Sequence, residues 1–140
     1  MRFTEREMTV AVDAVGKELY AATRPPWKRG SADDEWEAMT PGQKYQRRAA
    51  AGEVVLPVLI ALPDRPTVGA PPQFSDEEYA EAAVAGARAL VGSRDPDAWE
   101  SLSAKKQQAL LQTTVALTRA AVAAMPVRQD PDAITVPDHL

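Results

Sequence analysis

The chain has 140 residues with no cysteine, a single histidine and a formal net charge of −4. A chain of this length forms one domain that can bury a hydrophobic core without disulfides or a structural metal. The absence of cysteine excludes a disulfide framework, a thiolate nucleophile and cysteine-ligated zinc. With His139 as the single histidine, a Ser–His–Asp triad and a zinc or copper site have no support either. We therefore expect neither an enzyme nor a cofactor.

The negative charge lies in the second half of the chain. Residues 1–73 carry ten basic and ten acidic side chains, whereas residues 74–140 carry six and ten. Such a surface repels phosphate backbones, so the composition argues against a nucleic-acid binder. The first residues lack the apolar run of a signal peptide, and no stretch approaches the roughly 18 apolar residues of a membrane span. We expect a cytoplasmic protein that does not bind a membrane.

The first predicted helix spans residues 4–22. Thr4 and Glu7 have the spacing of a capping box, in which each side chain binds the other residue's backbone amide. Phe3 can pack against Met8 as a hydrophobic staple. Apolar residues then recur on one helical face, at Met8, Val12, Val15 and Leu19.

The loop over residues 24–30 is the first candidate for partner binding. Its prolines reduce the entropy lost when the loop is ordered on a partner, and Trp and Arg dominate binding hot spots. The candidate residues are Arg24, Trp27, Lys28 and Arg29. The alternative, which we favour slightly from the sequence, is that Trp27 folds back as a lid on the core.

The second long helix is predicted over residues 40–62, with Thr40 as its cap, Pro41 at its first position and Gln43 completing a capping box. Pro57 falls well inside it and costs roughly 3 kcal/mol relative to alanine. We expect a kink or an early end of the helix near residues 53–56. The alternative for residues 54–56 is a strand.

A basic cluster begins one turn into this second long helix. It consists of Lys44, Arg47 and Arg48, with Tyr45 between them. Arginine at these positions indicates a solvent-exposed helix end or one that faces an acidic partner. The acidic second half of the same protein could be that partner, which would make the chain self-associating, for example as a homodimer.

The second half repeats the pattern of the first. After a proline-rich linker at residues 64–73, the predicted helices span 75–92 and 103–125, with Ser75 and Glu78 as another capping box. Residues 34–40 around Trp36 correspond to residues 97–103 around Trp99, and we expect both tryptophans to be buried anchors. Small residues on the helix 75–92, including Gly86, would let a neighbouring helix approach closely.

These elements predict an all-α protein with four main helices, built from two tandem, diverged helix–loop–helix units that pack as one bundle-like domain. Unit 1 spans residues 3–63, unit 2 spans residues 74–126, and the single domain covers 1–126. The loop of the first unit is eight residues longer. Residues 127–140 are predicted to be an arm or a flexible tail.

Acidic residues precede both tryptophans, and the Trp-x-x-[Leu/Met]-[Ser/Thr] segment leads into an alanine-rich helix. This pattern resembles a segment of small uncharacterised helical proteins of actinobacteria and their phages, which implies a helical fold and such a source but no activity. The segment is also similar to part of an HMG box, a family that binds DNA through a basic surface. Here the corresponding surface carries acids, among them Asp95, Asp97 and Glu100.

The acids around the tryptophans could bind calcium or magnesium, which prefer oxygen ligands. Asp95 and Asp97 begin like a calcium loop, but Glu100 stands where that loop needs glycine and Lys106 where it needs glutamate. We favour solvated loops whose acids lie near the positive ends of the following helices, and predict no metal site.

The leading hypothesis from the sequence is a non-enzymatic helical interaction module that binds another protein or itself. One alternative is a nucleic-acid-associated regulator with a local basic patch at Trp27, Lys28, Arg29, Arg47 and Arg48. The other is a carboxylate-dependent enzyme or metal binder.

Overall fold

The computed structural model describes residues 1–65, 67–93 and 95–129, except for the side chain of Arg29. About three quarters of the described residues are helical, and they form no strand. The elements are, in chain order, α1 (Glu5–Ala22), the 3-10 helix η1 (Pro26–Ser31), α2 (Ala32–Ala38), α3 (Pro41–Ala61), α4 (Asp76–Gly92), α5 (Ala98–Ser101) and α6 (Ala104–Ala124). The predicted all-α class and the four long helices are confirmed. The loops before α3 and α6 contain the short helices η1, α2 and α5, which were not predicted.

The long helices begin where their capping residues predict. Thr4 accepts a hydrogen bond from the amide of Glu7 at 3.1 Å, and its own amide donates to the Glu7 carboxylate at 2.8 Å. The same reciprocal pair forms between Thr40 and Gln43 and between Ser75 and Glu78. Ser103 caps α6 with a single bond from the amide of Lys106.

Helix α3 continues through Pro57 to Ala61. The predicted early end near residues 53–56 is therefore wrong, and so is the alternative of a strand. Val55, Val58 and Leu59 on both sides of the proline are buried in the core. Their burial is worth about 1.5–3 kcal/mol for each side chain, which together exceeds the roughly 3 kcal/mol cost of the proline.

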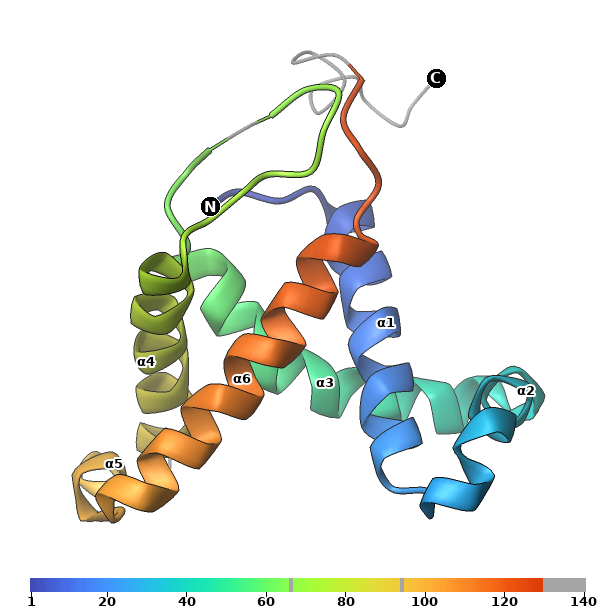
Figure 1. Ribbon diagram of the computed structural model, residues 1–140, viewed down its shortest axis with the longest axis horizontal. Coiled ribbons are helices and arrows are strands. Elements are labelled where there is room, and N and C mark those ends of the chain that lie inside the picture. Colours follow the sequence, from blue (N-terminus) through green and yellow to red (C-terminus); the bar gives the residue numbers. More distant parts are fainter. Residues whose placement is uncertain (66, 94, 130–140) are drawn as a thin grey trace.

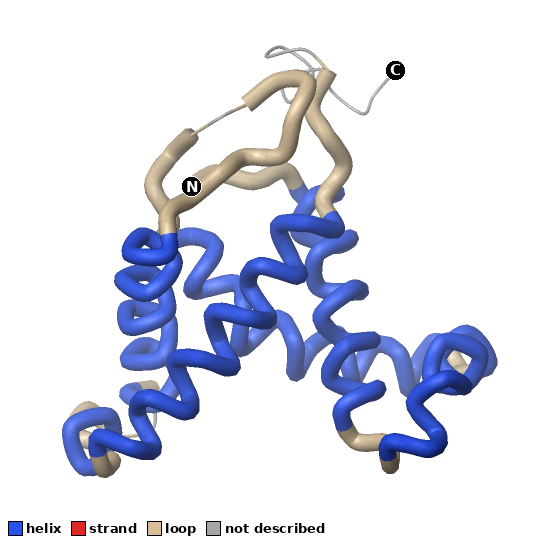
Figure 2. The backbone as a smooth tube through the Cα atoms, viewed as in Figure 1, coloured by secondary structure: helices blue, strands red, loops and turns tan. Residues whose placement is uncertain are grey.

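Helices α3 and α6 cross in the middle of the molecule, with α1 and α4 on either side (Figure 1). Both α1 and α4 pack against α3 and against α6. The short helices α2 and α5 lie at opposite ends of the longest axis (Figure 1), whereas residues 67–75 of the α3–α4 connection and residues 125–129 lie at one edge of the molecule (Figure 2). The two ends of the long axis are thus built by different halves of the chain.

The shared core contains side chains from all four long helices. Val15 from α1, Val55 and Leu59 from α3, Tyr79 from α4 and Val122 from α6 belong to one buried cluster. Within the described ranges, no helix is both long enough and apolar enough to cross a bilayer.

The predicted close approach of a helix to Gly86 is confirmed. A Cβ atom at Gly86 would lie 2.4 Å from Val58 Cγ2 and 3.1 Å from the Val58 backbone nitrogen. Helix α3 therefore contacts α4 with its backbone, one residue after Pro57. This contact holds the end of α3 against the second half of the chain.

Candidate interaction site

Trp27 lies on η1, and 81% of its surface is exposed. Its interpretation as a lid on the core is wrong. The buried tryptophan of this half is Trp36, which is 1% exposed and lies against Gly16, where a Cβ would be only 2.9 Å from the indole. Trp27 is left as a large apolar side chain in solvent.

The loop that carries Trp27 is held in place by Glu35. The Tyr20 hydroxyl donates to this carboxylate at 2.5 Å and Arg24 Nη2 donates at 2.8 Å. The hydroxyl of Ser31 lies 3.2 Å from the same carboxylate and 2.8 Å from the Lys28 carbonyl oxygen. The hydrogen bond from Tyr20, followed by the charge of Arg24, lowers the pKa of Glu35, so the carboxylate is ionised at neutral pH.

Most of the candidate basic residues contact groups of the same half of the chain. Arg48 Nε lies 2.8 Å from Asp13 Oδ1, and Lys44 Nζ lies 3.9 Å from Glu37 Oε2. The Arg47 guanidinium lies over the Tyr20 ring, 5.0 Å from its centre. Within the chain, the acids that face this cluster come from α1 and α2 and not from the second half.

The candidate residues therefore divide into two groups. Arg47 and Arg48 connect α3 to α1, Lys44 connects α3 to α2, and Arg24 connects the loop after α1 to α2. Trp27 and Lys28 are exposed at the tip of the loop. The side chain of Arg29 lies outside the described residues.

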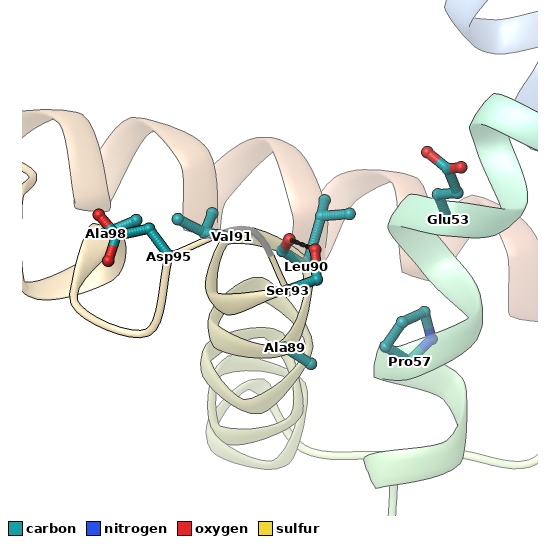
Figure 3. A pocket seen from close by; sticks show the side chains of 8 residues that line it. All are labelled: Glu53, Pro57, Ala89, Leu90, Val91, Ser93, Asp95 and Ala98. Carbon is teal, nitrogen blue, oxygen red and sulfur yellow. Dashed lines mark hydrogen bonds between the residues drawn. The ribbon is translucent and has the colours of Figure 1, made fainter.

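A cavity lies at the α5 end of the molecule, opposite the end that carries α2. A cavity of about 770 Å³ opens between the middle of α3, the C-terminal part of α4 and the start of α5 (Figure 3). Pro57, Leu90 and Val91 supply apolar walls, and Glu53 and Asp95 place carboxylates at its edge (Figure 3). This cavity was not predicted from the sequence.

Two arginines that the sequence analysis missed connect the ends of the two halves. Arg65 follows α3 and binds both carboxylate oxygens of Glu78 at 2.8 Å. Arg128 follows α6 and binds Glu7 in the same way, at 2.8 and 2.9 Å. Each half thus supplies an arginine to the capping box of the other. The signal was present, since both arginines stand two residues after the proline that follows a long helix.

These contacts change the charge state of the capping glutamates. The guanidinium of Arg65 and the amide of Ser75 lower the pKa of Glu78 to about 2. Burial alone would raise the pKa of Glu7, but hydrogen bonds from Arg128 and the Thr4 amide outweigh it, and this pKa is also lowered. The Glu7–Arg128 pair is buried, with exposed side-chain fractions of 7% and 9%.

The predicted tail begins with these packed residues. Arg128 pairs with Val68 of the α3–α4 connection in an isolated bridge, and its carbonyl accepts a hydrogen bond from Gly69 at 2.7 Å. Residues 130–140, including His139, lie outside the described residues. Among the residues that are described, no three acidic or histidine side chains come together as metal ligands would.

Comparisons with known protein families, with curated proteins and with solved structures find no match. The resemblance of the Trp36 and Trp99 segments to small helical proteins of actinobacteria and phages therefore stays a prediction.

Proposed function

We propose that this protein is a non-enzymatic interaction module that binds another protein, or a second copy of itself, through Trp27. The observation that carries the proposal is the position of Trp27, 81% exposed at the tip of a loop that is fixed at its base. A buried tryptophan stabilises a fold, whereas an exposed tryptophan contributes most to the free energy of binding when a partner covers it.

The fixed base of the loop lowers the cost of binding. Ordering a flexible loop on a partner costs about 0.5–1.5 kcal/mol for each immobilised side chain. Here the Glu35 network and the prolines at residues 25 and 26 hold the backbone of η1 before any partner arrives. The backbone position of Trp27 is thus fixed before binding, and tryptophan is one of the residue types that dominate binding hot spots.

The nucleic-acid alternative has less support. Arg24 and Arg48 are in ion pairs with Glu35 and Asp13, so they are poorly placed to displace counterions from a phosphate backbone. Lys28 is the one cation beside Trp27 whose exposed side chain is described. A steep loss of DNA or RNA affinity with salt would favour this alternative.

Photo-crosslinking tests the proposal directly. A benzoylphenylalanine at position 27 should form adducts with the partner or with excess protein. The matched control is position 60, because Ile60 is also exposed, at 67%, but lies at the far end of α3. Equal crosslinking at both positions would contradict the proposal.

We also infer that the chain consists of two diverged copies of one helix–loop–helix unit, residues 3–63 and 74–126. Supporting contacts recur at matched positions. Arg65 also donates to the carbonyl of Gln73 at 2.9 Å, and Arg128 donates to that of Arg2 at 3.1 Å. Residues 2 and 73 are equivalent in the repeat, and so are 65 and 128.

A second recurring contact joins the first helix of each unit to its tryptophan segment. Lys17 pairs with Glu37 at 3.6 Å, and Arg88 pairs with Glu100 at 3.2 Å. An experimental structure in which both helices of each unit superpose would support the duplication. Different angles between the helices of the two units would contradict it.

A further inference from the structure

We propose that the cavity at the α5 end of the molecule binds the Trp27 tip of a second copy, so that copies associate head to tail. This inference rests on the proposed function, because it names the partner of Trp27 as the protein itself. The occupant is η1, and the receiving site is the cavity between α3, α4 and α5 (Figure 3).

The chemistry of the cavity matches this occupant. Its volume of about 770 Å³ lies within the range of roughly 300–1,000 Å³ that ligand pockets have, which leaves room for an indole ring and part of its flanking chain. Pro57, Leu90 and Val91 offer apolar contacts to the ring. Glu53 and Asp95 lie at the edge of the cavity. When the indole of Trp27 from a second copy is inside, Lys28, the next residue of that copy, would lie at this edge.

The charges are available on both sides. Neither Glu53 nor Asp95 is in an ion pair with any other described residue, and the same is true of Lys28 (Figure 3 shows both acids). A contact of Lys28 with Glu53 or Asp95 is therefore favoured over one that brings two of these acids together.

The geometry requires a second molecule. Helix α2, which directly follows η1, and helix α5, which borders the cavity, lie at opposite ends of the longest axis (Figure 1). One copy therefore cannot fill its own cavity. Because the two surfaces differ, each dimer keeps one unused tip and one unused cavity, and growth continues into a ring or an open filament.

The test uses sedimentation of the full chain over a range of concentrations. Wild type should move from monomer to larger species, while Trp27→Ala should lower the association constant at least tenfold. Two independent cavity variants, Glu53→Lys and Ala89→Phe, both at exposed positions, should do the same. Glu81→Lys makes the same charge change on α4 outside the cavity lining and should behave as wild type.

Mixing the variants decides the polarity. Trp27→Ala keeps an intact cavity and Ala89→Phe keeps an intact tip, so the mixture should form a one-to-one dimer that grows no further. The inference is wrong if wild type stays monomeric up to about 1 mM, or if the mixture does not associate. It is also wrong if Trp27→Ala abolishes association and both cavity variants leave it unchanged, although Trp27 would then still be the contact that the proposed function requires. Association that is unaffected by Trp27→Ala would contradict both.

Discussion

The three tryptophans have different environments that assign them different roles. Trp36 and Trp99 are 1% and 5% exposed, and each lies in a short helix that contacts a long one. Trp36 also lies 6.4 Å from the ring of Tyr20, centre to centre. Trp27 has no comparable contact surface. Two tryptophans therefore anchor the ends of the fold, and the third is available for a partner.

Replacing either buried tryptophan with alanine should lower the free energy of unfolding by roughly 3–5 kcal/mol, because the change removes a large buried side chain and leaves a cavity. Trp27→Ala is the internal control and should change it by less than about 0.5 kcal/mol, as exposed positions do. Urea unfolding of the three variants measures these differences. A loss below about 1 kcal/mol for Trp36→Ala or Trp99→Ala would mean that the residue is not an anchor.

Gly86 gives a second prediction at the level of a residue. Gly86→Ala should destabilise the protein by about 1–3 kcal/mol, because the new Cβ would lie 2.4 Å from Val58 Cγ2 and close to the α3 backbone. Gly42→Ala is the matched control, since no atom lies within 4 Å of the Cβ position at Gly42. Because alanine has a higher helix propensity than glycine, this change should leave the stability unchanged or slightly improved. Thermal unfolding compares the two. Equal effects at both glycines would argue against the close α3–α4 contact.

At the level of elements, the start of α1 depends on a pair of charges from distant parts of the chain. Glu7 belongs to the capping box and binds Arg128, which lies beyond the end of α6. Removing one partner of a buried ion pair leaves the other charge uncompensated, which typically costs about 3–5 kcal/mol. The pair therefore couples the N-terminal end of α1 to the segment that follows α6.

This pair predicts a pH dependence of stability. Because the pKa of Glu7 is lowered in the folded state, its contribution is complete above the ordinary glutamate pKa of about 4.3 and is lost as pH falls through the lower folded value. Glu7→Gln should lower the free energy of unfolding at pH 7 by about 3 kcal/mol, and the difference from wild type should shrink towards zero below pH 4. Unfolding in urea from pH 2.5 to 7 measures it.

The control for this pH series is Glu5→Gln, an exposed glutamate in the same first turn. Its difference from wild type should be small at every pH. If the difference between Glu7→Gln and wild type does not change with pH, the pKa of Glu7 is not lowered in the folded state, and the effect of the Arg128 contact on this pKa is contradicted.

At the level of the whole molecule, local patterns predicted the elements and the close approach at Gly86 but missed other contacts between the elements. The starts of the long helices were predictable because a capping box such as Thr4 with Glu7 involves residues three positions apart. The exposure of Trp27 depends on the tertiary packing of its loop, and the Arg65 and Arg128 contacts depend on the end of each half lying beside the start of the other. The cavity beside Pro57 depends on the separation of α3, α4 and α5, which no local pattern encodes.

The arginine contacts between the two halves and their common core also predict how the protein unfolds. Because Arg65 and Arg128 each bind the other half and the four long helices share one buried cluster, neither half should unfold alone. Far-ultraviolet circular dichroism and tryptophan fluorescence should report one coincident transition in urea. Two separated transitions would mean that the halves are independent.

The most direct test of the central claim, that Trp27 is exposed in the free protein and covered on binding, is ¹⁹F NMR of protein labelled with 5-fluorotryptophan. Three resonances are expected, and Trp27→Phe identifies the one from position 27. In dilute protein this resonance alone should shift between H₂O and D₂O; as the concentration rises it should move and lose that sensitivity, while Trp36 and Trp99 stay unchanged. The account is contradicted if the Trp27 resonance is insensitive to solvent in dilute protein, or if it stays fully sensitive in the bound state.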